Sequence, residues 1–403
     1  MTTDPVSESN GRTTRNPSRI VLGSASAVVV TSLPVFLVGA LSVQLALDLA
    51  FNPTQLGLAV GAFKGAGAIS STILGRLADR LGATRSLRIS LLLAIIACVG
   101  IPTLARNATH LTLFLVIAAF GKSISQPGAN RMLSRNIPPH RQGIAFGIKQ
   151  SATPTASLLA GASVPVIAAV SGWQSAFFAT AVLGLSSLFL IGPRPAGNSR
   201  TSVQGSSDAA PARESSIIVP LLATAFGLST VASATVPVFL VLSAVDIGLE
   251  VGDAGLLLAA ASGAAIVMRL ALGPVADRMM YGHLWLCTGL ILIGAAGVGL
   301  LSTSSLMPFA FGSALAMVGT WGFNGVFWYS LVQLHRSSPG RITGRVAPAG
   351  MVGGVVGPSF MGLVSQTISF QFAWLSLAFV ALVAGLTMGL AASLAGASSD
   401  HAA

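Results

Sequence analysis

The sequence is poor in charge, and poorest in carboxylates. Only 8% of its 403 residues are charged, and Asp and Glu contribute 11 of them against 22 Lys and Arg. Hydrophobic residues make up 53% of the chain, which excludes a soluble domain of this length because so much apolar surface could not be buried. The net charge of +11 does not indicate nucleic-acid binding, since basic patches interleaved with aromatic residues are absent.

Residues that carry catalysis or bind metals are also scarce. The two cysteines, Cys98 and Cys287, fall in separate apolar segments and are interpreted as buried free thiols. The five histidines lie at or near predicted helix ends or in the tail, without metal-ligand spacing. Paired acids and Ser–His sets are missing from the apolar segments. We therefore predict no catalytic residues, no metal site, no cofactor and no enzymatic activity.

Long apolar runs are what the sequence has in abundance. Runs of about 20 residues recur, the length needed to cross ~30 Å of hydrocarbon. Because backbone groups in lipid must be satisfied within a segment, these runs predict an all-α membrane protein with twelve transmembrane helices. The predicted spans are residues 20–46, 55–76, 86–105, 111–134, 143–168, 174–192, 217–244, 254–275, 283–303, 307–333, 346–368 and 372–395.

The largest polar interruption lies near the middle of the chain. Residues 193–216 are rich in Pro, Gly, Ser and charge, which predicts a linker between two six-helix bundles. The bundles comprise residues 20–192 and 217–395, with tails at 1–19 and 396–403. The first apolar run is too long for a signal-peptide core, so we expect no cleavable leader.

Arginine is distributed unevenly between the two sets of connections. The tails, the linker and every second connection carry most of the arginines, whereas the alternate connections contain only Arg106. Four acids lie in or beside those alternate connections, at positions 48, 246, 250 and 253. The positive-inside rule therefore places both termini and the linker in the cytoplasm. We expect a multi-pass protein of a bacterial plasma (inner) membrane, acting as a monomer.

The two bundles repeat each other. The segment Gly75–Arg80 (Gly-Arg-Leu-Ala-Asp-Arg) returns 198 residues later as Gly273–Arg278 (Gly-Pro-Val-Ala-Asp-Arg). A nearly constant offset at several places indicates two structurally similar halves, a plan common among secondary transporters. Further matching pairs, at offsets of 200 and 201, are Pro139 with Pro339, Arg141 with Arg341, Gly161 with Gly362 and Trp173 with Trp374.

The first copy of this segment resembles a known signature. The pattern Gly75-x-Leu-Ala-Asp79-Arg80-x-Gly-x-x-Arg85 is similar to the loop between spans 2 and 3 of the major facilitator superfamily, although the usual basic residues are replaced by Ala83 and Thr84. The resemblance covers the whole chain. It implies twelve helices in two pseudo-symmetric halves and secondary transport by alternating access.

The resemblance also implies a cytoplasmic gate. In it, the aspartate of the signature meets a helix end and basic groups of the other half, through charge-assisted bonds that can open and reclose. For the arginines taken alone, positive-inside anchoring is the simpler interpretation. The residues assigned to this gate are Gly75, Asp79, Arg80, Arg85, Arg269, Asp277 and Arg278. Substrate binding is the alternative for Arg269, which lies two turns before Asp277.

The chain has only three lysines, and all three lie inside apolar spans. Counted from the outer ends, Lys64 lies ~15 Å and Lys122 ~17 Å deep, while Lys149 lies ~9 Å from the inner face. A lysine at a helix centre costs ~2.5–3.5 kcal/mol. All eleven acids lie in tails, loops or span ends, so none is placed to neutralise the lysines. Snorkelling remains open for Lys149; Lys64 and Lys122 must lose a proton or bind an anion.

Further polar residues accompany the lysines. Lys122 opens the segment Lys-Ser-Ile-Ser-Gln-Pro-Gly, a loose match to the basic position that the family often carries in span 4. Pro154 interrupts the backbone ladder about one turn beyond Lys149. The family's arrangement implies that spans 1, 4, 7 and 10 line the cavity; helix packing is the alternative for the span 10 residues. The predicted substrate-binding residues are Lys64, Lys122, Lys149, Gln150, Gln126, Trp321 and Asn324.

These residues predict a transporter for a small organic anion of the carboxylate type. Lysines of the first half would hold the charged group, and aromatic residues of the second half would face an apolar body. A proton or a counter-anion could drive the cycle. The bilayer is the expected surrounding, and no nucleic-acid partner is expected. Alternatives are a proton-linked exporter of drugs or other hydrophobic compounds and, in a different class, a transport-inactive membrane sensor.

Overall fold

The computed structural model describes residues 17–191, 217–279, 282–334 and 339–400, so the predicted linker lies outside the described residues. The described residues are helical and contain no strand. Twelve helices among them are long and apolar enough to cross a membrane. The predicted all-α fold with twelve transmembrane helices is confirmed.

The first half begins at Pro17 and ends at Ile191. Its third helix starts with a capping box, in which the Asn52 side chain accepts from the Gln55 amide and the Gln55 side chain accepts from Asn52, next to Pro53 at the first helical position. The elements are α1 (Pro17–Ala40), α2 (Ser42–Leu49), α3 (Pro53–Leu81), α4 (Ala83–Leu104), α5 (Ala108–Asn136), α6 (Pro139–Ser163), the π-helical turn η1 (Val164–Ala168), α7 (Ala169–Ser171) and α8 (Trp173–Ile191).

The second half has the same order of long helices without the short extra elements. Its last helix continues through Asp400, into residues 396–403 that the sequence predicts as a tail. The elements are α9 (Ile218–Asp246), α10 (Val251–Arg278), α11 (His283–Leu300), α12 (Leu306–Leu334), α13 (Pro339–Thr367) and α14 (Phe370–Asp400).

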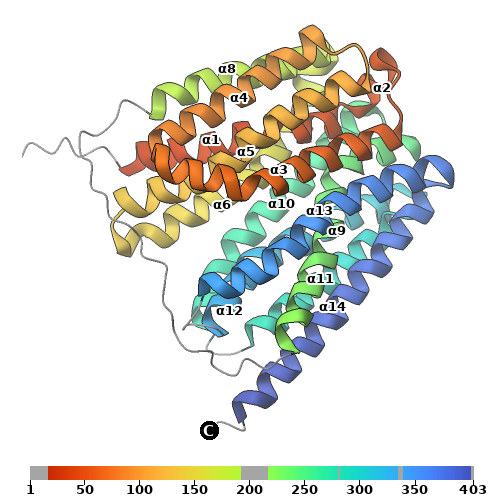
Figure 1. The fold of residues 1–403 in the computed structure, drawn as a ribbon. Coiled ribbons are helices and arrows are strands. Elements are labelled where there is room, and N and C mark those ends of the chain that lie inside the picture. The colour runs from red at the N-terminus through yellow and green to blue at the C-terminus, as the bar shows by residue number, and fades with distance from the viewer. Residues whose placement is uncertain (1–16, 192–216, 280–281, 335–338, 401–403) are drawn as a thin grey trace, which may run out of the picture.

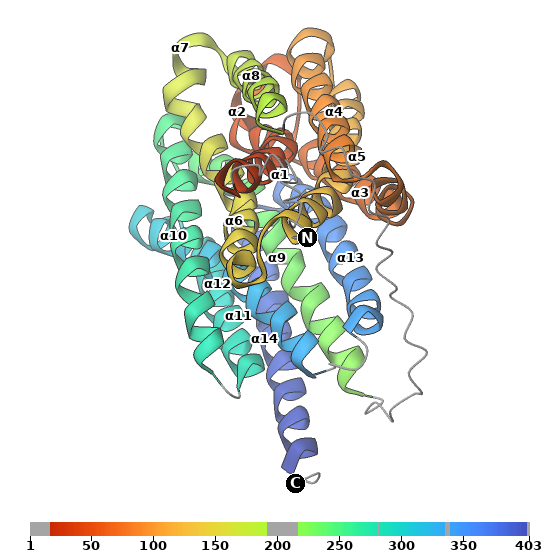
Figure 2. The same cartoon turned by 90° about the vertical axis from the view of Figure 1, so that its left-hand side faces the viewer.

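The two halves form separate bundles that meet along a narrow seam. Figure 1 shows them converging at one end and diverging at the other, and Figure 2 gives the view turned by 90°. The seam is made by α3 with α13, by α6 with α10 and by α1 with α9. We call the end where α1 begins and α14 ends the terminal end, and the opposite end the far end.

At the far end the halves touch backbone to backbone. A Cβ atom at Gly57 of α3 would collide with the Pro358 carbonyl oxygen of α13, and one at Gly362 would collide with the Pro53 carbonyl oxygen. The Thr54 hydroxyl donates to the Gly362 carbonyl (3.2 Å). Glycine is required here because only a residue without a side chain permits such a close approach.

The second arm of the seam, between α6 and α10, is similarly tight. A Cβ atom at Gly161 would lie 2.6 Å from the Gly255 carbonyl oxygen, and the Ser262 hydroxyl donates to that of Ser157 (2.9 Å). Toward the terminal end the packing is open instead. A Cβ atom would meet nothing within 4 Å at Gly75, Gly143, Gly273 or Gly344.

Candidate functional site

Lys122 lies at the centre of the candidate site. Its ammonium group, on α5, donates to the Ser32 hydroxyl of α1. Beside this pair, the hydroxyl groups of Ser125 and Thr31 lie 3.0 Å apart and link α5 to α1 a second time. Lys122 is close enough to both other lysines for electrostatic repulsion. Lys64 of α3 and Lys149 of α6 therefore each lie within electrostatic range of Lys122.

Lys64 extends from α3 across the seam. A Cβ atom built at Gly354 of α13 would lie 3.7 Å from the Lys64 Cδ atom. The same Cβ atom would lie 3.9 Å from the Thr230 methyl group of α9. The lysine therefore reaches from the first half to α13 of the second half.

Lys149 is only 4% exposed. Its ammonium group donates to the Gln150 amide oxygen (3.2 Å), and it lies within electrostatic range of Arg269. A side chain so fully covered does not reach solvent, as snorkelling would require. Gln150 itself is exposed.

The two remaining amides lie on different halves. Gln126 is half-buried on α5, one turn beyond Lys122. Asn324 is half-buried on α12, and its amide nitrogen donates weakly to the Thr320 carbonyl of its own helix (3.4 Å). Each amide therefore keeps an oxygen that can accept a hydrogen bond from another group.

Trp321 is 5% exposed, and its side chain contacts three other residues. Its indole N–H donates to the Ser233 carbonyl of α9 (2.8 Å), and its ring lies 5.9 Å from the Phe36 ring of α1. The Arg269 guanidinium, on α10 of the second half, lies 5.9 Å from the centroid of the Trp321 ring. Trp321 thus meets Arg269 with its ring, while its indole N–H is used by Ser233.

The other aromatic residues of α12 pack against each other. Phe327 stacks on Phe226 of α9 at 4.8 Å between ring centroids, and Phe323 and Trp328 contact the same ring edge-on. Phe323 and Phe327 are fully buried. The aromatic cluster therefore forms the core between α9 and α12, which is the packing alternative stated for this segment.

At the terminal end, Asp79 of α3 has a basic partner in its own half. Arg131 of α5 donates to the Asp79 carboxylate (3.1 Å) and to its backbone carbonyl (2.7 Å). The resemblance implies a partner in the other half, but the halves are apart here. From the sequence alone, no role was assigned to Arg131. Its position on the last turns of α5, beside the signature loop, could have indicated it as a partner of Asp79.

The remaining gate residues are placed as follows. Arg80, Arg85 and Arg278 are exposed at the terminal end. Asp277 lies on α10, and its side chain is outside the described residues.

Arg269 joins the lysine site. Its Nε donates to the Trp321 carbonyl (3.0 Å) and its Nη1 to the Gln150 carbonyl (2.7 Å). The second bond crosses from α10 to α6, between the two halves. For Arg269 the sequence allowed a role in the gate, which it favoured, or in substrate binding; the structure sets it within electrostatic range of Lys149.

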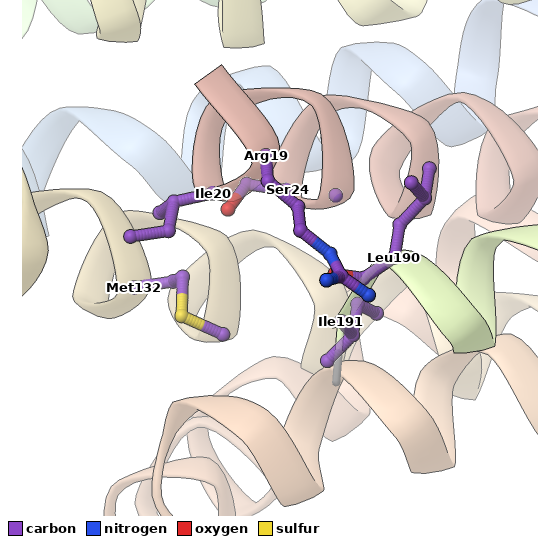
Figure 3. Close-up of a pocket in the computed structure, with 7 residues that line it drawn as sticks. Arg19, Ile20, Ser24, Met132, Leu190 and Ile191 are labelled. Carbon is purple, nitrogen blue, oxygen red and sulfur yellow. The ribbon is translucent and has the colours of Figure 1, made fainter. Parts of the chain in front are cut away.

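A small pocket at the terminal end is unrelated to this site. It lies between α1, α5 and α8, where Arg19, Ser24 and Met132 are among the lining residues (Figure 3). The Arg19 guanidinium donates to the carbonyls of Phe189 (2.8 Å) and Leu190 (3.3 Å). These carbonyls belong to the last described turn of α8, so Arg19 ties the start of α1 to that end of α8.

Comparison with known proteins identifies the family. The family model described as "Major Facilitator Superfamily" matches residues 21–351. The chain belongs to this superfamily. The two-bundle arrangement and the signature at Gly75–Arg85 are those expected of a member, and the protein is a secondary transporter of the membrane.

Solved members of the superfamily share the fold. A D-xylose–proton symporter aligns with a TM-score of 0.73 and 15% identity, covering 92% of this chain and 97% of the symporter. A bacterial homologue of the human lysosomal transporter Spinster, in an inward-facing and occupied conformation, aligns with a TM-score of 0.68 and 16% identity, covering 96% and 98%.

One curated relative matches over a shorter stretch. A hexuronate transporter of Bacillus subtilis (strain 168) is 26% identical over 138 residues. The match covers 34% of this chain and spans about a third of the relative's length, 32%.

Proposed function

We propose that this superfamily member transports a small organic anion, whose charged group is held among Lys64, Lys122 and Lys149. The supporting observation is that Lys64 and Lys149 both lie within electrostatic range of Lys122, with Arg269 near Lys149, and that the hydrogen-bond acceptors found for these lysines among the described residues are neutral. Lys122 donates to a serine hydroxyl and Lys149 to an amide oxygen. Neutral acceptors do not cancel the repulsion between the cations, but a carboxylate would.

The position of the acids supports the same proposal. The Asp79 carboxylate forms an ion pair with Arg131 at the terminal end. Asp48, near the far end, accepts from the Trp173 indole (2.7 Å). Asp246 and Glu250 stand at the junction of α9 and α10. Each of these carboxylates belongs to a helix end, so an anion from solution is the partner that fits the lysines.

The amides predicted for the site favour a hydroxylated rather than an aromatic substrate. The amides of Gln126, Gln150 and Asn324 can bind hydroxyl groups, whereas the rings of Phe323 and Phe327 are buried in the core. A sugar acid combines one carboxylate with several hydroxyl groups. The partial match to a hexuronate transporter makes hexuronates the first substrates to test.

The direction of opening follows from the charge rule. If the terminal end, with its arginines, faces the cytoplasm, the structure is the inward-facing state, closed at the far end by Gly57 and Gly362. Rocking of the halves about the seam would then open the far end and expose the lysines to the other side.

Uptake into proteoliposomes tests the proposal. We expect radiolabelled D-glucuronate or a related monocarboxylate to accumulate, and to accumulate far less with Lys64→Ala or Lys122→Ala. Arg106→Ala, which removes an exposed cation near the far end, is the matched control and should transport normally. Full transport by both lysine variants would contradict the lysine site. Efflux of cationic drugs instead of anion uptake would favour the exporter alternative.

A further inference from the structure

Two prolines near the middle of the bundles leave backbone carbonyls without their helical donor. Pro154 lies inside α6 and Pro237 inside α9. A proline has no N–H, so the carbonyl four residues earlier loses its usual partner. The carbonyls concerned are those of Gln150 and Ser233. Because an unpaired polar group in a membrane interior is costly, each needs a donor from elsewhere.

Both donors come from side chains of the second half. Arg269 donates to the Gln150 carbonyl (2.7 Å) and Trp321 to the Ser233 carbonyl (2.8 Å). Arg269 also donates to the Trp321 carbonyl and lies over the Trp321 ring. The four residues form one chain of contacts, from α6 of the first half through α10 and α12 to α9.

The bond from Arg269 to Gln150 is the only one of these that crosses between the halves. It lies directly beside the proposed anion site, because Gln150 follows Lys149 in sequence and its amide oxygen accepts from the Lys149 ammonium. Arg269 and Lys149 are also within electrostatic range of each other. An anion bound at Lys149 would therefore offer the guanidinium a third acceptor, besides the carbonyls of Gln150 and Trp321.

We propose that Arg269 is a substrate-sensitive latch, which holds α10 to the Pro154-freed carbonyl of α6 while the site is empty and releases it when an anion binds at Lys149. A guanidinium bonds more strongly to a carboxylate than to a neutral carbonyl, so the bound anion draws it away. The halves then lose a bond that favours the present conformation. Arg269 acts here as a positioning residue that couples occupancy to movement.

The latch itself can be tested without any ligand. Spin labels at Ile144 of α6 and Leu334 of α12, both exposed near the terminal end, report the separation of the halves in purified full-length protein. Cys98 and Cys287 are buried and do not compete for the label. The variants are Arg269→Gln, Arg269→Lys, Pro154→Ala and the double variant Arg269→Gln with Pro154→Ala. Alanine at position 154 supplies an N–H that competes with Arg269 for the Gln150 carbonyl.

We expect each single variant to increase severalfold the population with the terminal end closed. The double variant should add nothing to Arg269→Gln, because both changes break the same bond. Arg269→Lys should behave like Arg269→Gln, since an ammonium group cannot bridge the carbonyls of Gln150 and Trp321 as the planar guanidinium group does. Pro102→Ala, in α4 and away from the seam, and Arg106→Gln should match the unmodified protein.

Two results would overturn the latch. One is an unchanged distance distribution in Arg269→Gln. The other is a full additional effect of Pro154→Ala in the Arg269→Gln background, which would show that proline acts by bending α6 alone.

The release by substrate rests on the proposed function and is tested separately. D-glucuronate should shift the distances in the unmodified protein and leave Arg269→Gln unshifted. If D-glucuronate raises the melting temperature, and so binds, but leaves the distances unchanged, release by the anion is wrong. If neither D-glucuronate nor other carboxylates bind, the proposed function fails, and the latch is judged by the ligand-free distances.

Discussion

The two halves of the molecule share a fold but not a chemistry. The first half carries all three lysines, together with the Asp79–Arg131 ion pair. The second half contains no lysine. The repeated helices have kept the apolar pattern that builds a bundle, while the polar residues have specialised. The first half supplies charge to the site, and the second supplies the arginine and tryptophan that position it.

The matched tryptophans show the same divergence at the far end. Trp173 donates to the Asp48 carboxylate (2.7 Å). Trp374, its counterpart, is fully buried, and its indole N–H has no acceptor among the described residues. Asp48 and Asp246, which lie at an offset of 198, are both exposed. The same residue is therefore hydrogen-bonded in one half and only packed in the other.

The largest effect is expected where the halves touch. Gly57→Leu places a side chain into the Pro358 carbonyl, so the far end cannot close, and transport should fall to background while the protein still inserts. Gly289→Ala fills open space and is the control. Uptake assays, with cysteine labelling near the far end, measure both. Normal uptake by Gly57→Leu would show that this contact is not needed for closure.

The charge difference between the halves predicts the next effect. Lys122→Met removes the central cation and should raise the apparent KM for the anion about 10- to 100-fold, since a bond to a charged group contributes ~1.5–3 kcal/mol. Asn324→Leu, in the second half, should raise it only severalfold. Uptake at varied substrate concentration gives both values. An equal loss from both variants would contradict the division of roles.

The tryptophan pair offers a smaller but cleaner contrast. Trp173→Phe removes the hydrogen bond to the exposed Asp48 carboxylate and should cost ~0.5–1.5 kcal/mol more than Trp374→Phe, where no hydrogen bond is lost. The loss of ring volume is common to both variants, so the difference isolates the bond. Thermal unfolding in detergent, followed by tryptophan fluorescence, compares them. Equal melting temperatures would mean that the Asp48 bond adds no stability.

The smallest effect on stability is expected at the exposed gate pair. Asp79 is 73% exposed in its pair with Arg131, so Asp79→Asn should change the free energy of unfolding by less than ~1 kcal/mol. Its effect should appear in the transport rate instead, because we assign the pair to the gate. Melting temperature and initial uptake rate, measured on the same preparation, separate the two.

Much of the architecture was predictable from sequence because it depends on local pattern. Apolar run length gives the spans, the repeated Gly-x-x-Ala-Asp-Arg segment gives the two halves, and arginine counts give an orientation that remains a prediction. The capping box at Asn52 and the interruption at Pro154 are also local features. The lysines were singled out because lysine is costly inside a membrane wherever it falls.

What the sequence could not give is the partner of each polar group. Lys122 with Ser32, Asp79 with Arg131 and Trp321 with Ser233 all join residues far apart in the chain. Such pairs depend on how each helix is rotated about its axis and on which conformation the halves adopt, and packing of the whole bundle sets both.

Arg269 shows most clearly what the sequence determined and what only the tertiary structure decided. The sequence alone determined that Pro154 frees a carbonyl inside a membrane helix, because proline has no N–H in any fold. Only the tertiary structure decided that the donor is an arginine 119 residues away, in the other half. A missing hydrogen bond is a property of one residue, whereas its replacement is a property of two helices brought together.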